Sequence, residues 1–568
     1  MLWTVFSFLF FTALVAVIAY VRTRRDDLNT SDSYFLAGRG LSGWVIAGSM
    51  LLTNLSAEHL VGLNGQAYKN NLTSMAWETT PALATVIMAL FFLPRYLRGA
   101  FTTMPEFFED RYDARTRRLM SCLLLFGYVV VTLPAGCLYP GAVALNMIFD
   151  VQGLLGVNSW AGLWISVWFI GLVGAAYAVF GGLKAVAVSD SINGVGLLIG
   201  GLMVPVFALA ALGGGSLAEG FGKIVAETPE KLNAIGGAAD PVPFGTIFTG
   251  MVFANLFYWG TNQAVIQRCL GAKNLAEGQK GVLLAGLFKI FVPIVMLLPG
   301  VTAFHLYPGL DNADHAYPVL IAGVFPKLLL GFFTAVLFGA VLSTFDSMLN
   351  SAATLFCLDL YKPLLAPDID DAALIRRGKR VATIMALITM CVAPFVVYAP
   401  EGMFQFIRRS TGLFNIPMIA LVLVGFCTRR TSGPAACIAV VLYLAVYTVV
   451  VFILGEPIHF IHIMGLLFAG MVVVMLAVSR FIPRPAPYTM RQDKRAVDLA
   501  PWRYGPPFAT GLMALLVSIY LLCSPIGLAS HSGMKAPFYI AMAFVWGTAL
   551  IVMGALALRG ASPRSGSG

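Results

Sequence analysis

The chain has 568 residues, of which 59% are apolar and only 11% are charged, and its mean hydropathy is +0.83. A soluble globular protein carries about a quarter charged residues, so this composition predicts a membrane protein that crosses the bilayer many times. It excludes a string of soluble domains, a disordered chain and an enzyme held by a single anchor. The net charge of +10 gives little support to nucleic acid as a partner, because cytoplasmic loops of membrane proteins are basic.

Apolar runs of about 20 residues, the length that crosses the hydrocarbon core as a helix, recur along the whole sequence. The first run could be a signal peptide, but no small-residue cleavage site follows it, and its arginines come after it, at Arg22, Arg24 and Arg25. We therefore interpret it as a retained helix. About fifteen spans are predicted, and they begin near residues 1, 42, 79, 117, 159, 186, 245, 280, 327, 379, 403, 433, 459, 506 and 537.

The basic residues predict the orientation, because short basic loops stay on the cytoplasmic side. With the N-terminus outside, every second loop should be basic, and most of the 37 Lys and Arg residues lie in these loops or in the C-terminal tail. The loops include residues 95–118, 268–280, 362–380, 429–430 and 480–503. The lipid bilayer is thus a predicted partner, whereas nothing in the sequence indicates a partner protein.

Catalytic motifs are not evident among the spans. We find no Ser/His/Asp or His/Glu metal-ligand spacing and no GxxxxGK[ST] phosphate loop. The sequence therefore predicts neither an enzyme nor an ATP-driven pump.

Ionisable side chains inside membrane helices are costly and are functional candidates by default. Glu78 and Arg408 could instead lie at span ends and reach water or headgroups. Lys289, within GLFKIFVPIVMLL, needs a counter-charge that Glu58, Glu78, Asp190 or Asp346 could supply. The full set is Glu58, His59, Glu78, Asp190, Lys289, Asp346 and Arg408.

Two spans have polar centres that disfavour a continuous apolar helix. The second span contains GSMLLTNLSAEHLVGLNGQAY, and the span near residue 245 contains MVFANLFYWGTNQ. A helix opened at such a centre is tolerated only where it lines a cavity. Asn54-Leu55 and Asn255-Leu256 lie mid-span and five spans apart, so the second copy enters the bilayer from the opposite side, as in inverted-repeat transporters.

The span from about residue 327 contains FGAVLSTFDSMLNSAATLF, which has a face rich in hydroxyl groups. Small residues on one face permit close helix packing, which is one interpretation. Ser343 and Thr344 are adjacent, however, and do not share a packing stripe. Facing an opened helix, the two hydroxyl groups could supply oxygen ligands to a monovalent cation such as sodium.

At these residues the chain resembles the sodium:solute symporter family, and within it the sodium/glucose cotransporter-like bacterial branch. The matching segments are SYFLAGRGLSGWVIAGSMLLTNLSAEHLVGLNGQAY, FTTMPEFFEDRY, YAVFGGLKAVAVSDSING, NLFYWGTNQAVIQRCLGAKNLAEGQKG and STFDSMLNSAATLFCLDLYK. They lie in order over roughly residues 33–430. The resemblance to bacterial members implies the bacterial inner membrane as the location.

The resemblance implies an all-α fold of the LeuT type, with an inverted five-plus-five helix repeat. The expected regions are an extra N-terminal helix over 1–22, the transport core over 42–430, further C-terminal helices over 431–558 and a flexible tail over 559–568.

The family's sodium site implies a set of five ligand positions in this sequence. Carried over by position, the ligands are the backbone carbonyls of Leu52, Leu55 and Ala340 and the hydroxyls of Ser343 and Thr344. Asp190, in VSDSIN, matches an acidic position that is tied to sodium coupling.

The sugar site of the branch implies a second set of residues. These are Asn54, His59, Glu78, Asn255 and Lys289, with Tyr258 as an aromatic inner gate and Trp259 beside it. Amides and carboxylates pair with sugar hydroxyls, and aromatic rings cover an apolar sugar face.

Two positions depart from the family pattern. Pro81 stands where a small hydroxyl residue is common, and Arg408 stands where sugar transporters carry a glutamine. A guanidinium group suits a carboxylate or sulfate, so an acidic or sulfated sugar or another organic anion is an alternative substrate. The opposing interpretation is that Arg408 pairs internally with Glu78 or Asp346.

The predicted function is therefore sodium-coupled secondary active symport of a sugar or sugar-like solute by alternating access. Proton coupling stays open, because Asp190 and His59 could titrate. A membrane sensor with the same fold and a passive channel are further alternatives.

Overall fold

The computed structural model describes residues 2–23, 41–99, 104–180, 182–399, 402–490 and 497–561. Within residues 176–180 and 182–192 it describes the course of the backbone only. The predicted tail lies outside these ranges beyond residue 561. Apart from one isolated bridge between Leu41 and Ala272, the described secondary structure consists of helices and turns.

The described part of the first half of the chain is mostly helical. Its helices are α1 (Leu2–Thr23), α3 (Gly43–Asn54), α4 (Asn64–Lys69), α5 (Ala76–Thr79), α6 (Pro81–Ile87), α7 (Leu93–Gly99), α8 (Met104–Arg111), α9 (Ala114–Phe126), α10 (Tyr139–Ile148), α11 (Val151–Leu155), α12 (Ser159–Phe180), α13 (Gly182–Leu212), α14 (Leu217–Glu227), α15 (Gly250–Gly260) and α16 (Gln263–Leu270).

The second half continues in the same way. Its helices are α17 (Leu275–Met296), α18 (Leu298–Leu306), α19 (Ala316–Val324), α20 (Lys327–Leu355), α21 (Lys362–Leu365), α22 (Asp371–Val392), α23 (Met403–Cys427), α24 (Gly433–Thr448), α25 (Phe460–Phe481), α26 (Gly505–Leu522) and α27 (Ala536–Ala561).

Polar caps in the loops decide where several long helices begin. The carboxylate of Asp113 accepts the N–H of Thr116 at 2.8 Å before α9, and the amide oxygen of Asn274 accepts the N–H of Glu277 at 2.8 Å before α17. Such caps satisfy backbone donors that the first helical turn leaves without partners.

Eleven helices in the described residues are long and apolar enough to cross a membrane, so the chain is an integral membrane protein. The predicted spans near residues 1 and 159 coincide with α1 and α12, whose described apolar segments are shorter. The spans near 42 and 245 coincide with helices that are interrupted. The total of about fifteen therefore stays a prediction.

The first polar span is interrupted where the sequence predicts it. The helix α3 ends at Asn54, Leu55 is extended, and the chain becomes helical again at Ala57 before a π-helical turn over His59–Leu63 leads into α4. The carbonyls at the end of α3 are thereby left without donors in their own helix.

The second interruption lies elsewhere than predicted. Asn255 and Leu256 are part of the unbroken helix α15, and the break follows at Thr261–Asn262, before α16. The prediction of an opened helix at Asn255-Leu256 is therefore wrong. The Asn255 side chain donates a hydrogen bond to Thr80, so this polar residue is satisfied without any opening of the backbone.

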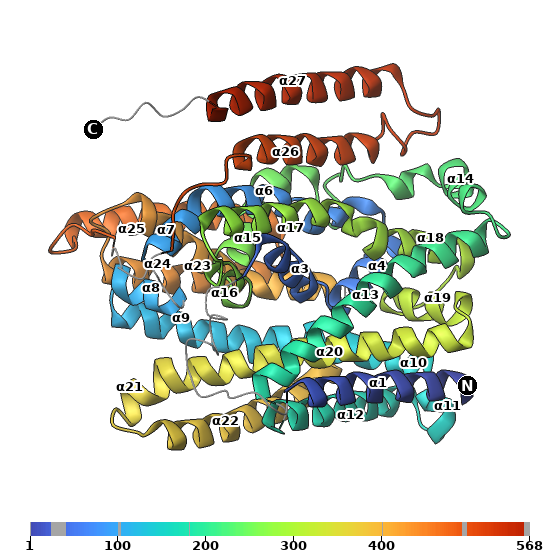
Figure 1. The fold of residues 1–568 in the computed structure, drawn as a ribbon, viewed down its shortest axis with the longest axis horizontal. Helices are drawn as coiled ribbons and strands as arrows, with labels where there is room; N and C mark the ends of the chain where they lie inside the picture. The colour runs from blue at the N-terminus through green and yellow to red at the C-terminus, as the bar shows by residue number, and fades with distance from the viewer. Residues whose placement is uncertain are drawn as a thin grey trace.

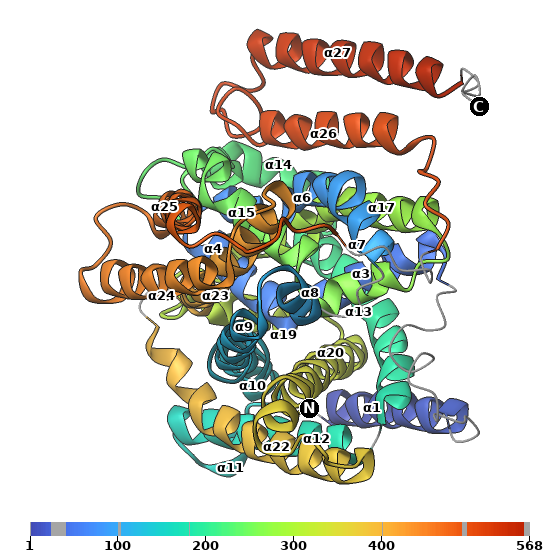
Figure 2. The same ribbon diagram turned by 90° about the vertical axis from the view of Figure 1, so that its left-hand side faces the viewer.

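The helices α26 and α27 are stacked along one edge of the molecule, and α1, α12 and α22 lie along the opposite edge (Figures 1 and 2). In the interior, α3 packs along α17 and α15 packs against α23, while α20 contacts α1 and α13. These contacts bring both interrupted helices to the middle of the molecule.

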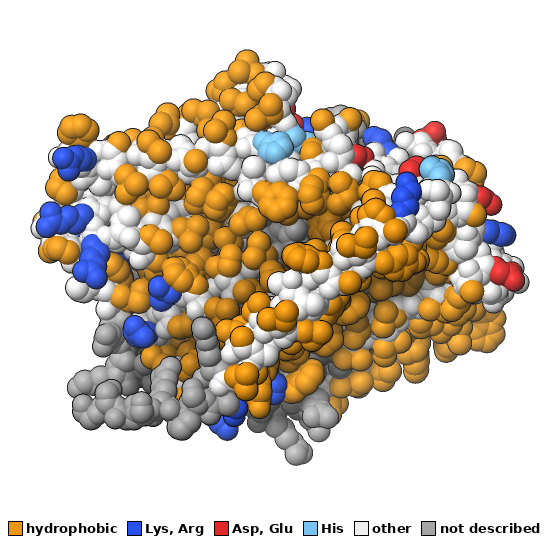
Figure 3. Space-filling view, turned by 90° about the horizontal axis from the view of Figure 1, so that it is seen from above, with side chains coloured by type: hydrophobic (Ala, Val, Ile, Leu, Met, Phe, Trp, Pro, Cys, Tyr) orange, Lys and Arg blue, Asp and Glu red, His pale blue; other side chains and the backbone are white. Residues whose placement is uncertain are grey.

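Hydrophobic side chains cover much of the face that Figure 3 shows. On α27, Phe544 is 74% exposed and Ile551 is 75% exposed. Side chains of this kind are stable in contact with lipid tails. In the same view, Lys and Arg gather mainly at one end of the helices and Asp and Glu mainly at the other.

Candidate substrate-binding pocket

A cavity of about 90 Å³ lies where the two interruptions meet, and this volume has room for several water molecules. Ser56 borders it from the first interruption and Asn262 from the second, and α5, α17, α20 and α23 contribute further residues. The structure brings together the whole predicted substrate set around it, namely Asn54, His59, Glu78, Asn255, Tyr258, Trp259, Lys289 and Arg408.

Lys289 finds its counter-charge in Glu78. Its ammonium group forms an ion pair with Oε2 of Glu78 and donates a hydrogen bond to Oδ1 of Asn54. The side chains of Lys289 and Glu78 are each 1% exposed. A charge buried to this degree is stable only when it is paired and hydrogen-bonded. The contact joins α17 to α5 and to the end of α3.

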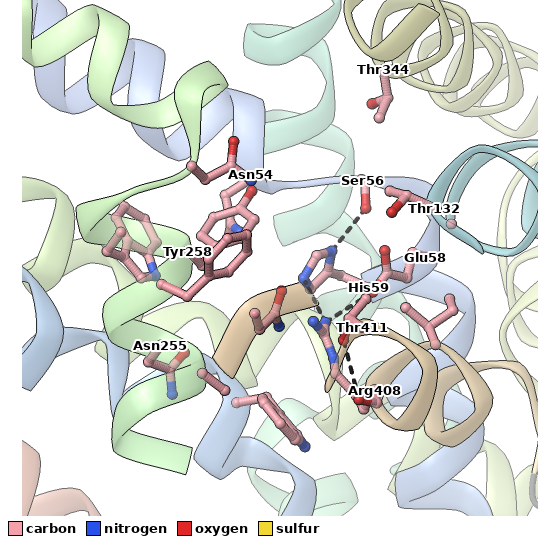
Figure 4. Close-up of a pocket in the computed structure, with 18 of the residues that line it drawn as sticks. Asn54, Ser56, Glu58, His59, Thr132, Asn255, Tyr258, Thr344, Arg408 and Thr411 are labelled. Carbon is pink, nitrogen blue, oxygen red and sulfur yellow. Dashed lines mark hydrogen bonds and ion pairs between the residues drawn. The ribbon is translucent and has the colours of Figure 1, made fainter. Parts of the chain in front are cut away.

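His59 connects this pair to the rest of the pocket. Its Nδ1 lies 2.8 Å from the hydroxyl of Ser56, and its Nε2 lies 3.4 Å from Nη2 of Arg408 (Figure 4). The same Nε2 lies 3.4 Å from Oε1 of Glu78. One nitrogen cannot at once accept from the guanidinium and donate to the carboxylate. Whether Nε2 carries a proton, which depends on the tautomer and charge of His59, therefore decides which of these two partners it binds.

Arg408 pairs internally, but with a different residue than predicted. Its Nη2 donates to Oε1 of Glu58 at 2.9 Å, whereas the predicted internal partner is Glu78 or Asp346. That choice was wrong, because Glu78 is already bound to Lys289. The guanidinium carbon also lies 5.0 Å from the ring centroid of Trp77 and 4.5 Å from that of Phe404, within the range of cation–π contacts.

Amide and aromatic groups line the other side of the cavity. Asn255 donates to the hydroxyl of Thr80 at 2.7 Å, so the residue before Pro81 supplies the hydroxyl that Pro81 lacks. The ring centroids of Tyr258 and Trp259 lie 5.7 Å apart, and Tyr258 lies beside Asn54 in Figure 4.

The structure describes the predicted sodium ligands less completely than the predicted substrate-binding residues. Leu55 lies at the first interruption, and Thr344 borders the cavity from α20 (Figure 4). The hydroxyl of Thr344 donates to the carbonyl of Ala340 at 3.0 Å, and Ser343 is half-buried one residue away. The side chain of Leu52 is outside the described part of the chain, although its backbone belongs to α3.

Asp190 belongs to α13, but its side chain also lies outside the described part, so its predicted coupling role stays a prediction. Sequence reasoning missed several residues that border the cavity, among them Ser56, Trp77, Thr132 and Asn415, and it named Glu58 only as an ionisable candidate and a possible partner of Lys289. A signal existed for Ser56, since it lies in the same polar segment as His59.

Comparison with known proteins defines the class. Residues 34–442 match the model of the sodium:solute symporter family. The chain is 43% identical to the uncharacterized symporter YidK of Escherichia coli (strain K12), over 93% of this chain and 91% of the relative. It belongs to the sodium:solute symporter family, whose members are transporters and not enzymes.

Two further similarities are more distant. The sodium/glucose cotransporter of Vibrio parahaemolyticus is 31% identical, over 76% of this chain and 82% of the relative. A solved structure of a Na⁺-coupled sialic acid symporter, in a substrate-bound outward-open state, covers 86% of this chain and 99% of its own with a TM-score of 0.70 at 19% identity. The structural likeness shows the fold, which is of the LeuT type that the sequence resemblance implies.

Proposed function

We propose that the protein is a sodium-coupled symporter that imports a neutral sugar or polyol across the bacterial inner membrane. The charge balance of the pocket is the observation that supports a neutral solute. Among the described residues that line it, the two permanent cations, Lys289 and Arg408, are each paired with a carboxylate. With His59 uncharged, no cation is left over for an anionic solute, and the remaining amides and hydroxyls suit the hydroxyl groups of a sugar.

The interrupted helix supports a sodium site next to this pocket. Carbonyls at the end of α3 lack donors in their own helix, and Thr344 faces the cavity from α20. Unwound carbonyls and hydroxyl groups near the midplane are the ligands that sodium-coupled transporters use. The proposed ligands are the carbonyls of Leu52, Leu55 and Ala340 and the hydroxyls of Ser343 and Thr344.

Coupling follows if each ligand favours the same conformation. Sodium bound between α3 and α20 would hold Asn54 beside Lys289 and Glu78, and would so prepare the pocket for the solute. By thermodynamic linkage the solute must then raise the affinity for sodium by the same factor. Movement of the proposed inverted repeats around this fixed site would open it to one side and then to the other.

The distribution of charge supports the predicted orientation. On the face that Figure 3 shows, Lys and Arg lie mainly toward the end of the molecule opposite the N-terminus, which Figure 1 marks, although some lie at the other end. Because basic ends stay cytoplasmic, the N-terminus would face the outside and solute import would run toward the basic end.

An anionic solute is the second candidate, and one observation favours it. Nε of Arg408 is buried and has no hydrogen-bond partner in the part of the chain that the structure describes. One donor of the guanidinium is thus left for a carboxylate or sulfate oxygen. A sialic acid symporter is among the structural relatives, although that likeness concerns the fold alone.

Transport by the purified protein in liposomes tests the proposal. An inward sodium gradient should drive accumulation of a neutral sugar or polyol above equilibrium, and an inside-negative potential should speed it, because sodium and a neutral solute carry net positive charge inward. Each 100 mV contributes about 2.3 kcal/mol per charge moved. Equal uptake with potassium in place of sodium would contradict sodium coupling, and preference for acidic sugars in competition would contradict the neutral solute.

A further inference from the structure

The carboxylate of Glu58 is held in a fitted position at the edge of the pocket. It follows the first interruption, its side chain is 10% exposed, and its Oε1 accepts from Arg408 at 2.9 Å. On its other side, a Cβ atom added at Gly136 would lie 2.9 Å from Oε2 of Glu58, closer than real Cβ atoms come to other atoms. The glycine in the π-helical turn Pro134–Leu138 therefore leaves the space that this carboxylate fills.

Arg408 presents further donors at the same place. Trp77 and Phe404 contact its guanidinium group, and both Arg408 and Trp77 line the cavity. Nη2 is bound to Glu58, while the buried Nε has no partner among the described residues. A guanidinium group with one N–H that has no partner, beside a pocket, can bind a carboxylate or sulfate oxygen. Here the protein's own carboxylate already occupies one side of it.

An anionic solute that reached Arg408 would meet two carboxylates, those of Glu58 and Glu78. It would have to displace Glu58 or lie beside it, and like charges in a poorly hydrated pocket repel strongly. A neutral hydroxyl group can instead accept from the remaining donors and leave the ion pair in place. The pair thus discriminates by an unfavourable interaction with the wrong solute as well as by contacts with the right one.

We propose that Glu58 sets the charge specificity of the pocket, because its carboxylate takes the place of a substrate anion at Arg408. The inference rests on the proposed function, since it presupposes a neutral solute. It predicts that Arg408 without Glu58 attracts an anionic solute, and that Glu58 without Arg408 attracts a cationic solute.

The experiment measures sodium-driven uptake of matched solutes by wild type, Glu58→Gln and Arg408→Gln in liposomes. The solutes are glucose, glucuronate and glucosamine, together with galactose, galacturonate and galactosamine. Glu58→Gln should raise the ratio of uronate to neutral uptake at least about tenfold, which corresponds to 1.4 kcal/mol. Arg408→Gln should raise the ratio of amino sugar to neutral uptake instead, because the Glu58 carboxylate is then exposed to the solute.

Glu456→Gln is the matched control. Glu456 pairs with Arg409, the next residue on α23, at 2.7 Å, but neither residue borders the cavity. This variant should leave both ratios as they are in wild type. If neither Glu58→Gln nor Arg408→Gln changes its ratio by more than twofold, the inference about Glu58 is overturned.

Two further measurements separate the possible failures. In wild type, uronates should compete with neutral uptake at least about tenfold more weakly than the parent sugars, and this needs no variant to fold. Wild type that transports uronates in preference contradicts the proposed neutral solute itself. Wild type that prefers neutral sugars, with no change of preference in either variant, contradicts only the role of Glu58.

Discussion

Lys289 on α17 and Glu78 on α5 form an ion pair in which each side chain is only 1% exposed. The same ammonium group donates to Asn54 at the end of α3. A single cation on a distant helix thus fixes the end of α3 and the short helix α5 to each other and to α17. This arrangement preorganises the pocket on the side where the first helix is interrupted.

Removal of one partner of the Lys289–Glu78 ion pair should lower the stability of the folded protein. Lys289→Met leaves the Glu78 carboxylate buried without its counter-ion, which typically destabilises a protein by about 3–5 kcal/mol. We expect a lower unfolding temperature of the purified protein and loss of uptake. The double variant Lys289→Met/Glu78→Gln should recover much of the stability but not the transport, because the polar contacts to the solute remain absent. Equal unfolding temperatures for the single and double variants would show that the two charges are not coupled.

The proposed sodium ligands on α20 give a second prediction. Removal of both hydroxyls in Ser343→Ala/Thr344→Ala should abolish the stimulation of uptake by sodium while the protein stays folded, because the cation loses two of its oxygen ligands. Ser351→Ala is a suitable control, since the Ser351 hydroxyl only donates to the carbonyl of Ser347 within the same helix. The dependence of initial uptake on sodium concentration is the measurement. A double variant that responds to sodium as wild type does would place the site elsewhere.

A third prediction concerns Asp314, in the turn between α18 and α19 outside the membrane spans. Its carboxylate accepts the N–H of Met403 at 3.3 Å, and burial raises its pKa from 3.8 to about 6. The folded protein therefore binds this proton more tightly than the unfolded chain does. Protonation of Asp314 therefore contributes its full stabilisation of the folded protein below about pH 4, and this contribution is lost as the pH rises through about 6.

The neutral variant Asp314→Asn should lack this dependence. Relative to it, wild type should lose about 2 kcal/mol of stability between pH 4 and pH 7, since the shift is worth 1.36 kcal/mol per pKa unit and the unfolded carboxyl group is already partly ionised at pH 4. Unfolding temperatures of both proteins over this range provide the measurement. Curves that stay parallel would mean that the pKa of Asp314 is not raised in the folded protein.

Close packing at Gly300 gives the fourth prediction. A Cβ atom there would lie 2.1 Å from the carbonyl oxygen of Asn64, so α18 and α4 approach through a glycine. Gly300→Ala should destabilise the protein by about 1–3 kcal/mol, because backbone atoms must move apart. Gly554→Ala on α27, where no atom lies within 4 Å, should not lower the unfolding temperature. If both substitutions lower it equally, the approach of α18 to α4 is looser than the structure indicates.

Much of the fold follows from local properties of the sequence. Apolar runs predict the long helices, because each run must satisfy its own backbone hydrogen bonds in lipid. The polar segment around Asn54 and His59 likewise predicts the break of the first core helix. The polar residues around Asn255 predict the second break at the wrong position. The Asn255 amide donates to Thr80, which is far away in the sequence, so Asn255 needs no opened backbone.

By itself the sequence determined which residues are able to carry charge inside the membrane, and therefore which ones need a partner. Only the tertiary structure decided the pairing, because four carboxylates were available to Lys289 and the sequence does not state which of them lies nearby. The packing of the helices placed Glu78 beside Lys289. It also placed Glu58 beside Arg408, although 350 positions separate Glu58 from Arg408 in the sequence. A buried charge takes the partner that the packing of helices brings within hydrogen-bond distance, and that distance depends on the whole arrangement of spans.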